Sequence, residues 1–125
     1  MRKLPFLNGI RAFEAAARAE SFAKAANLTA LLRLVEEAAA GGARLIVTPE
    51  MATTAYCWAT RDEVAGDVEP VPGPTTDRFR EIAARYNCWI VVGLPEVDPV
   101  TGAYYNSAVL LGPEGPVGVY RKTHA

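Results

Sequence analysis

Two residues of opposite charge, Glu50 and Lys122, each follow a predicted strand in this 125-residue sequence. Glu50 comes one proline after the apolar run 44–48, and Lys122 ends the β-rich run 117–122. Open α/β sheets assemble their sites beyond the carboxyl ends of their strands, so we expect both side chains at one sheet edge. A carboxylate and an ammonium placed there can pair. Spacing alone leaves open whether each is a site residue, a surface residue or part of a structural salt bridge.

The elements that must position these two residues alternate between helix and strand. A stripe of apolar residues at helical spacing over 28–39 predicts a helix that begins behind Asn27, and Gly41-Gly42 end it. The run 44–48 is apolar on both faces, which is typical of a strand in a sheet buried on both sides. The other predicted elements are a loop or partly formed helix over 59–74, a helix from Thr75 or Thr76 to Tyr86, a strand over 88–93 that ends at Leu94-Pro95-Glu96, and a hairpin of the runs 104–111 and 117–122. This order predicts α/β layers whose sheet starts parallel and finishes antiparallel.

The composition is that of an ordinary globular protein, because 50% of the residues are hydrophobic and 22% are charged. No apolar run is long enough to cross a membrane, and charges interrupt the N-terminus where a signal peptide needs an apolar stretch, so we expect a cytoplasmic protein. One histidine and two cysteines supply neither a disulfide framework nor a four-ligand zinc site. Residues 1–26 hold five basic and two acidic residues, whereas residues 27–125 hold eight and twelve, so the sign of the charge changes near residue 26.

Three stretches resemble the N-terminal half of a carbon–nitrogen hydrolase of the nitrilase superfamily. They occur in the family's order and read NLTALLRLVEEAAAGGA, RLIVTPEMATTAYCW and NCWIVVGLPEVDPVTGAYYNSAVLLGPEGPVGVYRKTH. The resemblance covers about residues 24–125. It implies an enzyme with an α-β-β-α sandwich that cleaves nitriles, amides or N-carbamoyl amines through a thioester, with a Glu-Lys-Cys triad and no metal or organic cofactor.

The resemblance also assigns roles to single residues. Glu50 matches the general base, which takes the proton from the cysteine thiol and later from water, and Lys122 matches the lysine that stabilises the oxyanion. The nucleophilic cysteine is expected downstream of Lys122 in a CYD-like context, which the 125 residues do not reach. Tyr56, Cys57 and Trp58 match positions that shape the substrate pocket, and the alternative for both aromatic residues is that they cover the sheet edge. We expect Cys57 to touch substrate rather than to act as the nucleophile.

Four further residues have less specific patterns around them. Cys88 opens an apolar strand and is expected to be buried packing. Glu96 follows Leu94-Pro95, and a structural and a functional role remain open for it. Asn106 is expected to hydrogen-bond a loop backbone near a turn, and it is not assigned to substrate. His124 is expected to be structural, because the triad of the family uses no histidine.

Residues 1–26 stand where the family normally has a buried opening strand. The stretch LPFLNGIRAFEAAARAESFAKAA resembles instead the first helix and the start of the second helix in the helix-turn-helix of a LysR-type regulator, without its recognition helix. We therefore predict a helical arm over 1–26 and a partial hydrolase domain over 27–125, as in a gene remnant, a mispredicted reading frame or a fusion. A basic amphipathic arm is favoured over a DNA-binding one.

The predicted fold is thus α/β, a truncated α-β-β-α sandwich of the nitrilase type with an extra N-terminal helical segment. The leading function is a hydrolase segment that has the base and the oxyanion residue, is inactive alone, and acts on a small nitrile, amide or N-carbamoyl substrate when completed. The alternatives are a non-catalytic pseudoenzyme or subunit-interaction module and a DNA-binding fragment. We expect a homo-oligomer without membrane or nucleic-acid partners. An uncovered sheet face and unpaired strand edges should make the isolated chain marginally stable or prone to associate.

Overall fold

The structure, a computed structural model, describes residues 23–54 and 64–123. Its elements along the chain are α2 (Ala23–Ala40), β1 (Leu45–Val47), α4 (Pro74–Tyr86), β2 (Trp89–Val97), β3 (Tyr104–Gly112) and β4 (Gly115–Arg121). The four strands form one sheet in the order β1-β2-β3-β4, with β1 parallel to β2 and the other neighbours antiparallel. The α/β fold with a parallel start and an antiparallel finish is therefore confirmed.

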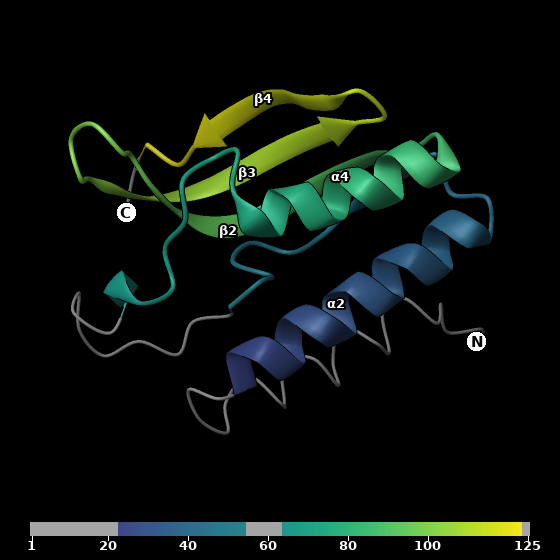
Figure 1. Ribbon diagram of the computed structural model, residues 1–125, viewed down its shortest axis with the longest axis horizontal. Coiled ribbons are helices and arrows are strands. Elements are labelled where there is room, and N and C mark those ends of the chain that lie inside the picture. The colour runs from purple at the N-terminus through teal and green to yellow at the C-terminus, as the bar shows by residue number, and fades with distance from the viewer. Residues whose placement is uncertain (1–22, 55–63, 124–125) are drawn as a thin grey trace.

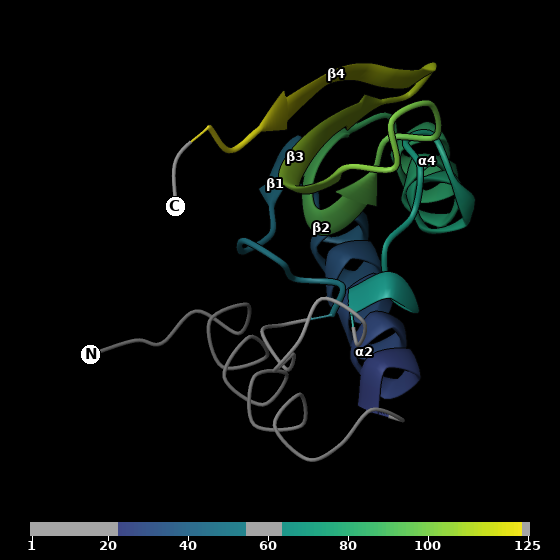
Figure 2. The same ribbon diagram turned by 90° about the vertical axis from the view of Figure 1, so that its left-hand side faces the viewer.

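Both helices pack on the same face of the sheet (Figures 1 and 2). Side chains at alternate positions of the strands point toward the helices, as the two-residue period of a strand requires. The core between these layers contains the following fully buried residues: Leu31 and Val35 of α2, Phe79 and Ala83 of α4, Ile90 and Val92 of β2, and Val109 and Leu111 of β3. This apolar layer joins the two helices to the sheet.

The opposite face of the sheet is not covered by any element among the described residues. Leu45 and Val47 are 60% and 53% exposed, whereas Ile46 between them is buried against the helices. Among the described residues, the first strand is therefore buried on one face only, which corrects the expectation of burial on both faces and agrees with the expected uncovered sheet face. Trp89 and Tyr120 add to the same apolar surface. The apolar run of β1 reflects a second face that is suited to burial but has no cover here.

Helix α2 begins earlier than the apolar stripe indicates. Asn27, expected to precede the helix, lies inside α2 with its side chain 1% exposed. The predicted boundary between residues 26 and 27 falls within this helix. At the other end, Gly42 has a φ of 101°, the left-handed conformation for which glycine is suited, so the predicted stop at Gly41-Gly42 is confirmed.

Helix α4 starts at Pro74, one residue before the predicted Thr75. Its first turn is fixed by Thr76, whose hydroxyl accepts a hydrogen bond from the backbone N–H of Gly73 at 2.8 Å. Its last turn is closed by Asn87 in the left-handed conformation, and β2 follows at once. The short connection places the start of β2 directly beneath the helix.

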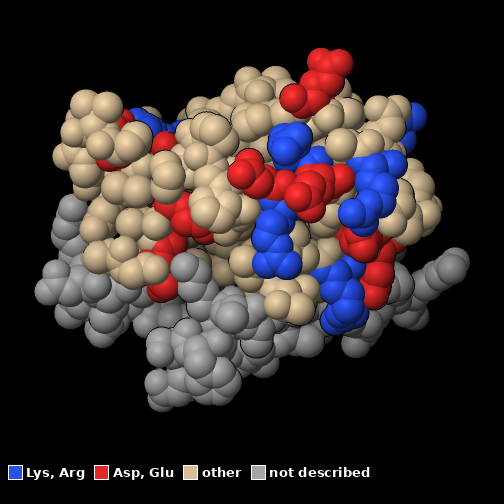
Figure 3. All heavy atoms as spheres, viewed as in Figure 1, with Lys and Arg blue, Asp and Glu red and all other residues tan. Residues whose placement is uncertain are grey.

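The outward surfaces of the two helices are charged. Arg33 pairs with Glu37 along α2, and Arg85 of α4 pairs with Glu36 of α2. Figure 3 shows basic and acidic side chains interspersed on this side of the molecule, as is usual for solvent-facing helix surfaces. None of the helices in the described ranges combines the length and the apolar character needed to cross a lipid bilayer.

Candidate active site

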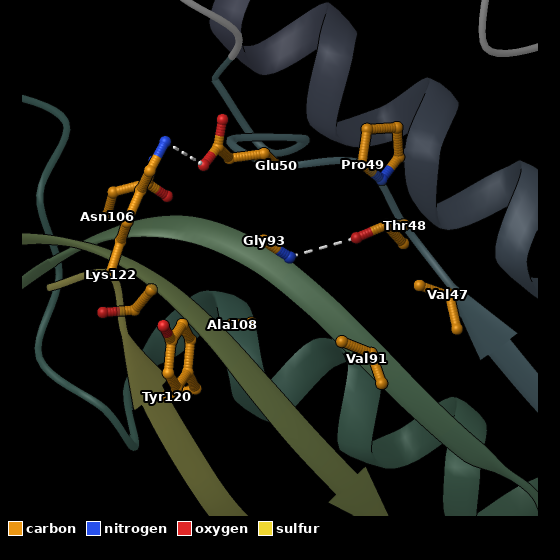
Figure 4. A pocket seen from close by; sticks show the side chains of 11 residues that line it. Val47, Thr48, Pro49, Glu50, Val91, Gly93, Asn106, Ala108, Tyr120 and Lys122 are labelled. Atoms are coloured by element: carbon orange, nitrogen blue, oxygen red, sulfur yellow. Dashed lines mark hydrogen bonds and ion pairs between the residues drawn. The ribbon is translucent and has the colours of Figure 1, made fainter. Parts of the chain in front are cut away.

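Glu50 and Lys122 meet at the edge where β1 and β4 both end. Strand β4 is antiparallel to β3 and β3 is antiparallel to β2, so β4 runs in the same direction as β2 and β1. The Lys122 Nζ donates a hydrogen bond to Glu50 Oε1 at 3.1 Å (Figure 4). The two side chains are 36% and 46% exposed, so the pair is accessible to solvent. The sequence correctly predicts that these residues share one sheet edge.

The backbone that presents Glu50 is held against β2 by Thr48 and Gly93. Thr48 Oγ1 accepts a hydrogen bond from the backbone N–H of Gly93 at 3.0 Å, and Thr53 N–H donates to the carbonyl oxygen of Gly93 at 3.3 Å. A Cβ added to Gly93 would lie 2.3 Å from the carbonyl oxygen of Pro49 and 3.1 Å from Glu50 Cα. Only glycine allows this approach, because both contacts are with main-chain atoms.

Lys122 is fixed by the end of the β3–β4 ladder. Ser107 lies opposite Arg121 in the register, and the next residue, Lys122, donates its backbone N–H to the carbonyl oxygen of Asn106 at 2.9 Å. Asn106 and Lys122 are therefore cross-strand neighbours. Asn106 lies within β3, in the strand-like run 104–111 that the sequence predicts, and the hydrogen bond of its side chain to a loop backbone stays a prediction.

The pair lies at one end of a hollow of about 360 Å³ on the uncovered face of the sheet. Glu50, Lys122 and Asn106 give this end its polar character. The floor away from them is apolar and consists chiefly of Val47, Val91, Ala108 and the ring of Tyr120 (Figure 4). A carboxylate, an ammonium and a carboxamide thus converge beside an apolar surface, which is the usual chemistry of a small-molecule site.

Glu96 does not belong to this hollow. It is 3% exposed on the helix-facing register of β2, where the hydroxyl of Ser107 donates to its Oε1 at 2.7 Å. Two hydrogen bonds from Arg121 hold the pKa of the Glu96 carboxyl below its usual range, and the bond from Ser107 lowers this pKa further against the opposing effect of burial. Of the two roles that the sequence left open, this geometry favours the structural one.

Of the two cysteines, Cys88 lies within the described residues and Cys57 does not. Cys88 is fully buried in the core beside the helices, and this burial raises the pKa of its thiol. The prediction that Cys88 is buried packing is confirmed. Cys57, with the other predicted pocket residues Tyr56 and Trp58, lies outside the described residues, as does His124.

Comparison with known proteins identifies the family. The carbon–nitrogen hydrolase family model matches residues 14–125, which is most of the chain. The chain belongs to the carbon–nitrogen hydrolase family. The match begins inside the predicted N-terminal arm, of which residues 1–22 lie outside the described part. The family prediction from the three motifs is confirmed.

This member of the family is similar to several named relatives. It is 41% identical over 93 residues to a nitrilase of Pyrococcus abyssi, covering 74% of this chain and 35% of the nitrilase. It is 33% identical over 103 residues to the omega-amidase NIT2 of Xenopus tropicalis, covering 81% and 36% of the two chains. A crystal structure of an N-terminal amidase superposes with a TM-score of 0.61 at 31% identity, covering 66% of this chain and 19% of that one. The chain thus spans about a third of the length of the first two relatives.

The sequence predicts the pair Glu50 and Lys122 but does not predict the contacts that hold the two residues in place. Gly93 is part of the quoted GLPE motif, yet its role depends on the proximity of the Pro49–Glu50 backbone, which nothing in the local sequence encodes. The contact of Arg121 with Glu96 was missed for the same reason.

Proposed function

We propose that this chain contributes the general base and the oxyanion-stabilising lysine to a carbon–nitrogen hydrolase site. The observation that carries the proposal is the 3.1 Å contact between Lys122 Nζ and Glu50 Oε1 at the carboxyl edge of the sheet. Membership of the family supports it, because a carboxylate and an ammonium at one sheet edge suit hydrolysis of a C–N bond.

In the proposed reaction the carbonyl carbon of an amide or N-carbamoyl substrate is attacked by a cysteine thiol whose proton passes to the Glu50 carboxylate; a nitrile first gives a thioimidate, to which a water molecule adds before the nitrogen leaves. The ammonium of Lys122 stabilises the negative charge that develops on the carbonyl oxygen. The C–N bond then breaks as the nitrogen takes the proton from Glu50 and leaves as ammonia or an amine. Water attacks the resulting thioester, Glu50 accepts its proton, and the acid and the free thiol are released.

The nucleophile comes from outside these 125 residues in this proposal. Cys88 is buried in the core and its thiol pKa is raised, which disfavours the reactive thiolate. Cys57 is assigned to the substrate pocket together with Tyr56 and Trp58. The short span relative to the nitrilase and the omega-amidase supports a site that further polypeptide completes.

The proposed substrates are small nitriles, amides or N-carbamoyl amines. The names of the relatives support this range, since they include a nitrilase, an omega-amidase and an N-terminal amidase. No metal or organic cofactor has a role in the proposed steps, and the proposed location is the cytoplasm.

The decisive experiment joins this chain to the remaining part of the Pyrococcus abyssi nitrilase and measures hydrolysis of amides and nitriles. The fusion should turn over substrate, whereas the 125-residue chain alone should not. Glu50→Gln and Lys122→Met in the fusion should each lower kcat by about 10²-fold or more, because a positioned base contributes about 10²–10⁴-fold. Full activity of Glu50→Gln would refute the assignment of the base, and turnover by the isolated chain that Cys57→Ala abolishes would refute the assignment of the cysteines.

A second candidate, a non-catalytic subunit-interaction module, is favoured by the uncovered apolar face with Leu45, Trp89 and Tyr120. Such a face is typical of surfaces that associate, and it supports the proposed homo-oligomer. Light scattering should then show a concentration-dependent oligomer that Leu45→Glu dissociates. The DNA-binding alternative depends on residues 1–26, and duplex binding that weakens steeply with salt would be needed to support it.

A further inference from the structure

Strand β4 is the edge strand of the described sheet. Among the described strands it pairs with β3 alone, and its residues 116–120 are all exposed. The ladder also contains an irregularity at Leu110 and Leu111. Main-chain hydrogen bonds give β4 its register, but an exposed edge strand held in this way can twist and fray at its end. A side-chain contact that holds the end of β4 would therefore add to the backbone hydrogen bond between Lys122 and Asn106.

Arg121 is the residue that anchors this end. Its Nε donates to Glu96 Oε1 at 2.9 Å and its Nη2 donates to Glu96 Oε2 at 2.7 Å, so the contact is bidentate. Nη2 also lies 3.4 Å from Asp98 Oδ2, and the guanidinium lies 4.1 Å from the centre of the Tyr105 ring. A planar fork held at both nitrogens fixes orientation as well as distance.

The anchor and the ammonium lie on opposite sides of the sheet. Successive side chains of a strand point to opposite faces. Arg121 lies opposite Ser107 and reaches Glu96 on the helix-facing side of the sheet. Ser107 and Glu96 are both buried there. Lys122 lines the hollow on the uncovered side together with Tyr120 and Asn106. The orientation of one side chain therefore sets the direction of the next.

The geometry points to Arg121 and Glu96 as a positioning pair that holds Lys122 in contact with Glu50 from the other side of the sheet. The inference deepens the proposed function, because it concerns the lysine to which that function assigns oxyanion stabilisation. Arg121 acts through the strand end and touches neither the hollow nor the charged end of Glu50. Glu96 supplies a buried acceptor whose position is fixed in turn by Ser107.

The test follows the contact between Glu50 and Lys122 in the full 125-residue chain, so it needs no activity. The measurement is the rate at which Lys122 is acylated by acetic anhydride at fixed pH, read by mass spectrometry with Lys3 of the same chain as the reference. In the otherwise unchanged chain, Glu50→Gln should speed acylation of Lys122 by about twofold to fivefold, because an exposed ion pair of this kind is lost. In an Arg121→Met background, Glu50→Gln should leave the rate unchanged, because the pair is already apart.

Two controls separate positioning from general stability. Arg85→Met removes the same charge from the exposed pair with Glu36, and Ile82→Val removes one methyl group from the core. In each of these two variants, Glu50→Gln should still speed the acylation of Lys122 by the full factor. Arg121→Lys keeps the charge without the bidentate fork and should restore part of the effect.

An undiminished effect of Glu50→Gln in the Arg121→Met chain overturns the inference. If the Arg121→Met chain fails to fold, Glu96→Gln takes its place in the test. This variant keeps a hydrogen-bond acceptor, and it must still reduce the change in acylation rate that Glu50→Gln causes. A Glu96→Gln chain with the full effect overturns it equally. Failure of the proposed function can be told apart from failure of this inference. If only the proposed function fails, the acylation result holds while the nitrilase fusion with Lys122→Met keeps its activity.

Discussion

Gly93→Ala should displace the backbone that presents Glu50. The added Cβ would meet the carbonyl oxygen of Pro49 at 2.3 Å and the backbone nitrogen of Met51 at 2.9 Å, whereas ordinary contact begins near 3.4 Å. The loop must therefore move by about 1.1 Å. Neither contact can be relieved by a side-chain rotation, since both are with main-chain atoms.

The cost of Gly93→Ala follows from these contacts. Overpacking of this kind destabilises by about 1–3 kcal/mol, and we expect the upper part of that range because backbone must shift. The hydrogen bond from Gly93 N–H to Thr48 Oγ1 is strained by the same movement and contributes about 1 kcal/mol. We therefore expect the free energy of unfolding to fall by about 3 kcal/mol. Since domains are stable by only about 5–15 kcal/mol, urea unfolding followed by circular dichroism will detect the loss.

Gly118→Ala is the matched control for this substitution. Gly118 lies in β4, and a Cβ there meets nothing within 4 Å. The control should change the free energy of unfolding by less than about 0.5 kcal/mol, as surface substitutions do. Equal stabilities of the two variants, or a crystal structure of Gly93→Ala with the contact between Glu50 and Lys122 still at 3.1 Å, would refute the reasoning.

Three further predictions follow from other contacts. Because the folded-state pKa of Glu96 is lowered, its ionisation stabilises the fold fully above the ordinary carboxyl range near about pH 4.3 and progressively less as the pH falls below it; Glu96→Gln should flatten this acid dependence in urea titrations. Gly112→Ala should cost about 1 kcal/mol and alter tryptophan fluorescence, because its Cβ would lie 2.4 Å from the ring of Trp89, a side chain that is 40% exposed and able to move. The Cys88 thiol should react with Ellman's reagent only when urea unfolds the chain, because it is fully buried, and reaction at the rate of a free thiol in the folded chain would contradict this placement.

The parts of the fold that the sequence predicts are those encoded by local periodicity. The apolar stripe of α2, the stop at Gly42 and the hairpin of β3 and β4 all depend on residues close together in the chain. The start of α2 was misplaced, because Asn27 has the side chain of a capping residue but is buried within the helix. At this position the packing of the longer helix outweighs the preference of asparagine for the start of a helix.

In the candidate site, too, the features set by local sequence could be predicted and those set by long-range packing could not. Glu50 and Lys122 could be expected to share one sheet edge from the positions of strand ends and from the family motifs. The contacts that hold these two residues in place could not be expected from the sequence. The contact of Gly93 with the Pro49 backbone and that of Arg121 with Glu96 depend on the register between segments 25 or more residues apart. Strand spacing and pleat decide such contacts, and single-sequence patterns do not contain them.

The uncovered sheet face has a consequence for the strength of the charged pair. Glu50 and Lys122 are hydrated on that face, and water weakens the attraction between them. A polypeptide layer placed over Val47, Val91 and Tyr120 would exclude this water and lower the local dielectric constant. The Coulomb attraction at a fixed distance rises about fourfold when the effective dielectric constant falls from about 80 to about 20. Covering the sheet would therefore strengthen the electrostatic field at the hollow without moving either charge.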